Sequence, residues 1–317
     1  MRRRSAPGLT LLATLLVAAC DGGSEGGSPE NSGGTTSTGG GGGASGSATG
    51  GGAGAGSSGG TSAGGGGSSG AGGSGATGTG GASGSGGSGG TSVTGTLVPL
   101  YTDPSDPTWA ALVSAKQKHP SVPVIAVVNP DNGPGAAKDP SYVTGTKALA
   151  DAGIVVLGYV MTGWAKTDPK TVVEPAIDHW VSWYPAVTGI FFDEQSSDAG
   201  DEAYYASLTA YAKGKGLTFT VGNPGADVPA TYVGSVDMML IYESAGTPSV
   251  ASLGGWHTQH SRDNFGIIPY AVSKLDPTFV QSAKPFVRYV YLTDDDLPNP
   301  WDTLPPYFEA LMTELEK

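Results

Sequence analysis

Eight short apolar runs recur along the last two thirds of this 317-residue chain. Each run is rich in Val, Ile or Tyr, and most are separated by stretches whose apolar residues have helical spacing. Strands and helices that alternate in this way pack as βα units around a parallel sheet. The runs span residues 97–101, 122–129, 154–160, 189–194, 218–223, 237–243, 265–272 and 287–293. Eight units within roughly 220 residues predict a compact (β/α)8 TIM-like barrel.

Helices are expected between most of these runs, at residues 107–118, 142–152, 170–184 and 200–215, with a last one at 304–316. The helical signal after the fifth and sixth runs is weak because Pro224, Pro229 and Pro248 interrupt it. We therefore expect an irregular barrel in that region. A doubly wound open sheet is the alternative architecture, since alternation alone does not show closure, and the number of strands favours the barrel.

The N-terminus has the pattern of a secretory signal peptide. Three arginines at residues 2–4 precede an apolar run at 9–19, which is too short for a bilayer-spanning helix. Residues 16–20 resemble a bacterial lipobox that ends at Cys20, and we expect this residue to be acylated. An ordinary signal peptide with a cysteine near its cleavage site is the alternative. Because Cys20 is the only cysteine, the rest of the chain has no disulfide, thiolate nucleophile or cysteine metal ligand.

Residues 21–94 consist almost entirely of Gly, Ser, Ala and Thr. This composition cannot bury enough apolar surface to offset its conformational entropy, so it predicts a disordered tether. The predicted organisation is a lipoprotein signal peptide at 1–20, a linker at 21–94 and a barrel at 95–317. We expect the protein to be lipid-anchored in a bacterial cell envelope. Two locations remain open, the outer membrane or cell surface and the periplasmic face of the inner membrane.

The net charge of −12 belongs to the predicted barrel, because the three N-terminal arginines balance the three acids in residues 21–30. A strongly acidic domain repels polyanions and makes a nucleic-acid partner improbable. The charge is compatible with a neutral or cationic ligand.

Acidic residues follow two of the apolar runs, where the active sites of barrels are built. Asp193 and Glu194 end the fourth run, and Glu243 ends the sixth. Two carboxyl groups at separate strand tips suit glycoside hydrolysis, in which one protonates the leaving oxygen and the other acts as nucleophile or activates water. The alternative is that these acids cap the helices that follow. Three acids that each end a strongly apolar run favour a catalytic role.

Further polar and aromatic residues at the strand ends are candidates for substrate binding. Asn129 and Asn223 begin loops rich in Gly and Pro, which force a compact path. The aromatic candidates for stacking on sugar rings are Tyr101, Tyr159, Trp164 and Tyr242. Packing beneath loops is the alternative role for each aromatic residue.

Metal-dependent and serine-dependent chemistry find little support in the sequence. His257 and His260 have a spacing that a helix could direct at one metal ion, but no zincin motif surrounds them. A G-x-S-x-G nucleophile elbow is absent from residues 95–317. We therefore expect no metal and no organic cofactor.

Several of these motifs together resemble the spherulin-4 family. They are residues 97–101, the loop 129–135, residues 157–160 with Thr162, and residues 189–194, in that order. The resemblance implies a (β/α)8 barrel. Some members of that family are glycoside hydrolases that cleave galactosamine-containing exopolysaccharide such as galactosaminogalactan. By this likeness, Asp193, Glu194 and Glu243 fall on the acidic active-site positions of the family.

The expected function is therefore that of an envelope-tethered, endo-acting glycoside hydrolase on a galactosamine- or N-acetylgalactosamine-containing polysaccharide. Asp193 or Glu194 is expected to act with Glu243, and the protein is expected to be a monomer. The alternatives are a non-catalytic glycan-binding lipoprotein and a structural surface lipoprotein with the same barrel.

Overall fold

The computed structural model describes residues 93–317. The predicted signal peptide, the lipidation of Cys20 and nearly all of the predicted linker lie outside the described residues, so they remain predictions. Within the described part of the chain, no helix has both the length and the apolar character that crossing a membrane requires.

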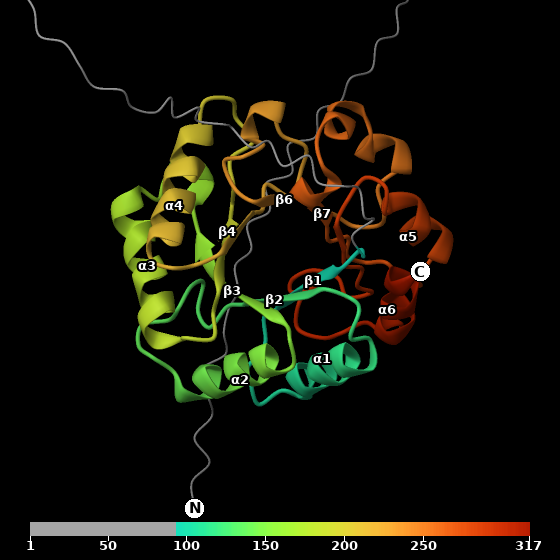
Figure 1. Cartoon of the computed structure of the whole chain (residues 1–317), viewed down its shortest axis with the longest axis horizontal. Coiled ribbons are helices and arrows are strands. Elements are labelled where there is room, and N and C mark those ends of the chain that lie inside the picture. The colour runs from blue at the N-terminus through green and yellow to red at the C-terminus, as the bar shows by residue number, and fades with distance from the viewer. Residues whose placement is uncertain (1–92) are drawn as a thin grey trace, which may run out of the picture. The chain divides into compact units, whose positions relative to one another are not determined.

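Eight parallel strands form the sheet, and each strand pairs with the next along the chain. Figure 1 shows the strands in a ring with the helices outside it. The strands are β1 (Thr96–Leu100), β2 (Val124–Val128), β3 (Val155–Met161), β4 (Gly189–Asp193), β5 (Phe219–Gly222), β6 (Met238–Tyr242), β7 (Phe265–Ile267) and β8 (Tyr289–Val290). This order confirms the predicted (β/α)8 TIM-like barrel.

Gly95, immediately before β1, joins the first strand to the last. Its N–H donates to Arg288 O over 2.9 Å, and its carbonyl accepts from Val290 N–H over 3.0 Å. A Cβ on residue 95 would lie 2.4 Å from Pro123 O and 2.8 Å from the Tyr289 ring. Only glycine permits this close approach, and these bonds connect the two ends of the sheet. An open doubly wound sheet would lack them.

Six α-helices surround the described barrel: α1 (Pro107–Lys118), α2 (Pro140–Asp151), α3 (Lys170–Trp183), α4 (Glu202–Gly214), α5 (Pro277–Ala283) and α6 (Phe308–Glu316). Three of them begin with the same pair of residues, an aspartate cap followed by proline. Asp106, Asp139 and Asp276 each accept a backbone N–H from the residue two positions later. Proline fits the next position because its missing N–H has no helical partner there.

The barrel is irregular where the prolines predicted it. No α-helix lies between β5 and β7 in the described barrel, and the helical segments that flank β6 there are all 3₁₀: η2 (Ala230–Tyr232), η3 (Val250–Leu253), η4 (Gly255–Gln259) and η5 (Arg262–Asn264). Several details differ from the sequence-based expectation: β8 covers only Tyr289–Val290 of the expected residues 287–293, and α6 begins at Phe308 where residue 304 was expected. The short helix α5 was not expected, and β7 ends at Ile267, well before residue 272, because Pro269 has no N–H for a strand ladder.

The two faces of β3 show which side chains enter the barrel. Gly158 faces the helix layer, since a Cβ there would lie 2.3 Å from Trp180 of α3. The Trp180 indole N–H also donates to Tyr159 O over 2.9 Å, which fixes the helix against the strand. Successive side chains of a strand point to opposite faces, so the Tyr159 side chain points into the barrel.

Candidate active site

Asn223 links two carboxyl groups at the carboxyl ends of three consecutive strands. Its side-chain nitrogen Nδ2 donates to Asp193 Oδ1 over 2.8 Å and to Glu243 Oε2 over 2.5 Å. Asp193 ends β4, Asn223 follows β5, and Glu243 follows β6. The two acceptor oxygens are therefore no farther apart than the sum of these two hydrogen-bond lengths. The structure brings together Asp193 and Glu243, which the sequence proposed as a catalytic pair, and Asn223, which it proposed as a binding residue.

Backbone hydrogen bonds hold this arrangement between neighbouring strand ends. Asn223 N–H donates to Phe192 O over 2.8 Å, and Gln195 N–H donates to Asn223 O over 3.1 Å. Glu243 N–H donates to Gly225 O over 2.9 Å. The side chains that meet in the site thus extend from main-chain positions that are themselves fixed.

Two tyrosines line the same part of the barrel. Tyr159 is buried, and its hydroxyl donates to Asp193 Oδ2 over 2.7 Å. The ring of Tyr101 contacts the Tyr159 ring edge-on, with 5.7 Å between the ring centroids. Burial and the nearby charge of Asp193 raise the pKa of both phenols well above the ordinary value, so both remain neutral. Tyr159 is therefore a hydrogen-bond donor to a carboxylate.

The two linked carboxyl groups are both harder to ionise than usual. Burial raises the pKa of Asp193, and the hydrogen bonds from Tyr159 and Asn223 oppose this rise. Burial, followed by the charge of Asp193, raises the pKa of Glu243 to about 7. Two interacting acids of this kind lose their protons in two steps that belong to the pair. Glu243 is therefore still partly protonated near neutral pH.

Glu194 lies beside this pair but points elsewhere. Its backbone is left-handed, with φ of 52°, directly after the last residue of β4. Burial and the charges of Asp193 and Asp168 raise the pKa of Glu194 to about 7, and the N–H of Gly163 opposes the rise. Gly163 and Asp168 both belong to the loop between β3 and α3, so the Glu194 carboxyl group faces that loop. The strand end thus separates two adjacent acids.

Of the other predicted binding residues, Asn129 and Trp164 lie in the loops after β2 and β3, and Tyr242 is the last residue of β6. Asn129 Oδ1 accepts Gly133 N–H over 2.9 Å, which closes the loop after β2. Trp164 lies in the 3₁₀ segment η1 (Gly163–Ala165) and is 47% exposed. Its backbone N–H donates to Glu194 O over 2.8 Å. The hydroxyl of the half-buried Tyr242 donates to Gly246 O over 3.0 Å. Of this group, Trp164 offers the most open aromatic face.

Thr162 is a residue to which the sequence analysis gave no role in the site. It follows β3 directly and is fully buried, and its hydroxyl lies within hydrogen-bonding distance of the carbonyl oxygens of Asp193 and Glu194. A polar residue at a strand end was the available signal. A hydroxyl that contacts main chain on a neighbouring strand cannot be recognised from sequence spacing.

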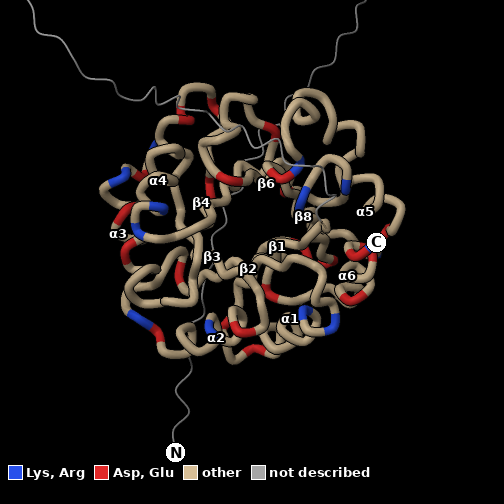
Figure 2. The backbone as a smooth tube through the Cα atoms, in the orientation of Figure 1, with Lys and Arg blue, Asp and Glu red and all other residues tan. Residues whose placement is uncertain are grey.

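Charged residues are unevenly distributed over the barrel. Figure 2 shows acidic positions beside the ends of β4 and β6, around the centre of the ring, whereas most Lys and Arg positions lie on the surrounding helices and loops. The site is therefore acidic, with its positive charges mostly at the periphery. Such a distribution favours a neutral or cationic ligand over an anionic one.

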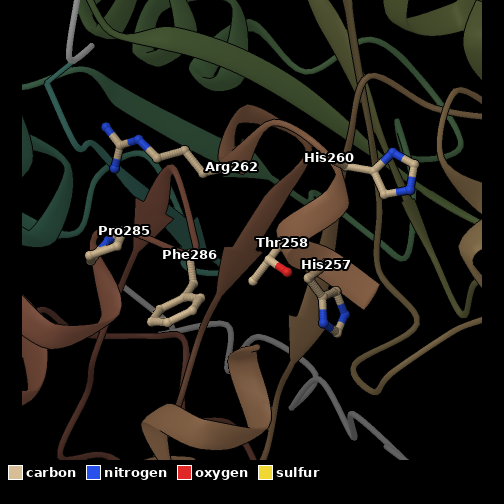
Figure 3. Close-up of a pocket in the computed structure, with 6 residues that line it drawn as sticks. All are labelled: His257, Thr258, His260, Arg262, Pro285 and Phe286. Atoms are coloured by element: carbon tan, nitrogen blue, oxygen red, sulfur yellow. The ribbon is translucent and has the colours of Figure 1, made fainter. Parts of the chain in front are cut away.

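The two histidines of the His257–His260 pair line a separate small cavity of about 130 Å³ (Figure 3). His257 is buried, with Nδ1 2.7 Å from Gly254 O and Nε2 3.1 Å from Asp227 Oδ1. Both ring nitrogens of His257 therefore already face protein oxygens. Among residues 93–317, no group of three His, Cys, Asp or Glu side chains is arranged to hold a metal ion.

Comparisons with known proteins agree with the barrel. The model of the family described as spherulation-specific family 4 matches residues 95–315. Spherulin-4 of Physarum polycephalum is 33% identical over 162 residues, which cover 50% of this chain and 48% of that protein. The match thus spans about half the length of this relative.

A solved structure is similar over nearly its whole length. It is the crystal structure of Aspergillus clavatus Sph3 in complex with GalNAc, with a TM-score of 0.65 and 25% sequence identity. The similarity covers 71% of this chain and 98% of the Sph3 chain.

Proposed function

This chain belongs to the spherulation-specific family 4, and from this membership and the site geometry we propose that it is an endo-acting glycoside hydrolase. The observation that carries the proposal is the Asn223 amide shared by the carboxyl groups of Asp193 and Glu243. Glycoside hydrolysis requires two acids that flank one bond and differ in protonation. The raised pKa of Glu243, about 7, supplies this difference.

The hydrogen bonds favour one assignment of roles within the pair. Asp193 accepts hydrogen bonds from Tyr159 and Asn223, which stabilise its ionised form. Among residues 93–317, the Glu243 carboxyl group accepts a hydrogen bond from Asn223 alone, and it lies next to the charge of Asp193. We assign the proton to Glu243 as general acid and the negative charge to Asp193 as nucleophile.

The closeness of the two acids favours a retaining reaction. Retaining enzymes separate their carboxyl groups by about 5–5.5 Å, and inverting enzymes by about 6.5–9.5 Å to admit a water molecule. In the first step Glu243 gives its proton to the leaving glycosidic oxygen while Asp193 bonds to the anomeric carbon. In the second step water replaces Asp193 and returns a proton to Glu243, so the product keeps the original configuration.

The proposed substrate is a polysaccharide that contains galactosamine or N-acetylgalactosamine. Sph3, the similar structure, is in complex with GalNAc. The net charge of −12 resides in residues 95–317, as the charge balance of the N-terminal segment shows, and an acidic surface attracts a partly deacetylated, cationic polymer. Glu194 and the exposed ring of Trp164 lie at the edge of the site and are proposed to contact the chain of sugars.

We also propose that Cys20 anchors the protein by lipid in a bacterial cell envelope and that residues 21–94 serve as its tether. The barrel begins at the amino ends of its strands, where Gly95 meets β8, whereas Asp193 and Glu243 are at the carboxyl ends. Gly95 is therefore at the opposite end of the barrel strands from the proposed active site.

The decisive experiment compares the wild type with Glu243→Gln on partly deacetylated N-acetylgalactosamine polymer. Release of reducing ends by the wild type and its loss in Glu243→Gln, with polymer binding retained, would support hydrolysis. The anomer released first, followed by NMR, tests retention. Binding of the polymer without release of oligosaccharide by the wild type would instead identify a glycan-binding protein.

A further inference from the structure

Thr162 contacts the main chain of both adjacent acids at the end of β4. Its N–H donates to Asp193 O over 3.1 Å. Its hydroxyl oxygen lies 2.7 Å from Asp193 O and 2.9 Å from Glu194 O. The side chain is fully buried, so water does not compete for these contacts. One hydroxyl at the end of β3 thus reaches two consecutive peptide carbonyls of the neighbouring strand end.

Tyr205 of α4 extends this contact into a small network. Its hydroxyl lies 3.2 Å from Thr162 Oγ1 and accepts Ser196 N–H over 2.7 Å. Burial raises the pKa of Tyr205 to about 12, so its hydroxyl retains its hydrogen at neutral pH. The loop that follows β4 is therefore held from two sides, by a residue of β3's end and by a residue of α4.

The segment held by this network has an unusual backbone. Glu194 has φ of 52°, in the left-handed region that non-glycine residues seldom adopt. Such conformations persist where surrounding contacts hold them in place. Here the turn sends the Glu194 carboxyl group toward the β3–α3 loop and leaves Asp193 on the Asn223 amide.

We propose that Thr162 is a positioning residue whose hydroxyl holds this turn and thereby keeps Asp193 beside Glu243. The inference rests on the proposed hydrolase function, because it states how the two acids of that reaction are held in position relative to each other. Thr162 does not itself contact the reacting atoms.

The Thr162 hydroxyl is not needed to give the carbonyl oxygens of Asp193 and Glu194 a hydrogen-bond donor. Asp193 O already accepts the N–H of Thr162, and Glu194 O already accepts the N–H of Trp164 over 2.8 Å. Neither carbonyl would be left without a donor if the hydroxyl were removed. Valine has nearly the shape of threonine, so Thr162→Val should fold while losing the contact that fixes the turn.

The experiment compares Thr162→Val with Thr162→Ser, which keeps the hydroxyl, on partly deacetylated N-acetylgalactosamine polymer over a range of pH. We expect Thr162→Val to lower kcat on the order of 10²-fold, since small displacements of catalytic groups have effects of that size. KM should change little. The basic limb of the pH profile should move to lower pH, because Glu243 would lose the nearby charge that helps to keep it protonated. Thr162→Ser should behave as the wild type.

A matched control removes a similar hydroxyl contact far from the site. Thr144 of α2 donates to Pro140 O over 3.0 Å on the exposed helix, and Thr144→Val should leave kcat and the pH profile unchanged. Thr162→Val with the kcat and pH profile of the wild type would overturn the proposal. An equal loss in Thr162→Ser would also overturn it, because the hydroxyl would then not be responsible.

A titration separates this proposal from the hydrolase function. Carboxyl ¹³C NMR of the wild type, Thr162→Val and Thr162→Ser follows the ionisation of Asp193 and Glu243 without any turnover. We expect a lower apparent pKa for Glu243 in Thr162→Val only. If the wild type hydrolysed no polymer, the proposed function would fail, whereas this titration shift would still support the positioning role. Identical titrations in all three proteins would refute it.

Discussion

Tyr159 donates its phenolic hydrogen to Oδ2 of Asp193 over 2.7 Å. The pairing of β3 with β4 places Met161 opposite Asp193 and Tyr159 opposite Phe191. Tyr159 therefore enters the barrel one layer below the carboxylate and reaches up to it. The Asn223 amide approaches the other oxygen of the same carboxylate. Each oxygen of Asp193 thus has its own donor, which favours the ionised state that a nucleophile requires.

Removing the phenolic hydroxyl should make Asp193 harder to ionise. Tyr159→Phe keeps the ring but deletes one of the two donors, so the pKa of Asp193 should rise further. We expect the acidic limb of the kcat/KM profile to move to higher pH and kcat to fall roughly 10-fold, as expected for a hydrogen bond to a charged group. A pH–rate series on the polymer measures both effects.

The control for this change is Tyr211→Phe. The Tyr211 hydroxyl donates to Asp178 over 2.9 Å between two outer helices, which is the same kind of bond away from the site. Its loss should leave the pH–rate profile in place. An acidic limb that does not move in Tyr159→Phe would show that this bond does not tune Asp193.

Glu243 should destabilise the folded protein above neutral pH. Burial and the charge of Asp193 raise the pKa of Glu243 to about 7, from an ordinary value of 4.5. Below the ordinary value the group is protonated in both folded and unfolded chains, so folding carries no ionisation cost. As the pH rises from that value toward 7, the Glu243 carboxyl group ionises in the unfolded chain while it stays protonated in the folded one. The free energy of unfolding therefore falls over this range.

Glu243→Gln removes this cost and keeps the hydrogen-bonding shape. We expect the variant to be more stable than the wild type by about 1–3 kcal/mol near pH 8, with the gain vanishing near pH 4. Thermal unfolding at several pH values measures the difference. Glu309→Gln serves as the control, since the hydrogen bond from Lys118 lowers the pKa of Glu309. Removing the Glu309 charge should therefore give no gain in stability. Equal stability of Glu243→Gln and wild type at both pH values would contradict the assigned environment.

The strands and the acids at their ends were predictable because both depend on local pattern. A buried parallel strand reads as an apolar run, and the first polar residue after it lies at the carboxyl edge of the sheet. This reasoning found Asp193 and Glu243 without any tertiary information. The weak helical signal between β5 and β7 was equally local, since it came from prolines.

The contacts among these residues were not predictable, because they join side chains from different strands. Asn223 was expected to bind substrate, yet its amide also links two carboxyl groups. Tyr159 was expected to stack on a sugar, and its hydroxyl is bonded to Asp193. The left-handed backbone of Glu194 has no signature in its sequence, because contacts from Thr162 and Trp164 hold it.

The proposed lipid anchor is tested by Cys20→Ala in the exporting bacterium. The wild type should fractionate with membranes and enter the detergent phase, because acylation would add an apolar chain to the new N-terminus. Cys20→Ala should leave the membrane fraction while the barrel retains the same thermal unfolding. Unchanged membrane association in Cys20→Ala would refute the anchor.

Gly222 and Gln195 form a packing contact that supports the site from the outer face of the sheet. Gly222 ends β5 immediately before Asn223, and a Cβ on it would lie 1.5 Å from Gln195 Oε1. The Gln195 side chain is buried, with Nε2 3.8 Å from Met239 Sδ, so it has little room to move aside. Gly222→Ala should therefore destabilise the protein by about 1–3 kcal/mol, the usual cost of overpacking.

Adding Gln195→Ala to the same chain frees the space and should recover much of this loss. Chemical denaturation of the two single variants and the double variant measures the coupling, which exceeds about 0.5 kcal/mol for residues in contact. Additive effects of the two substitutions would show that this contact does not hold the end of β5.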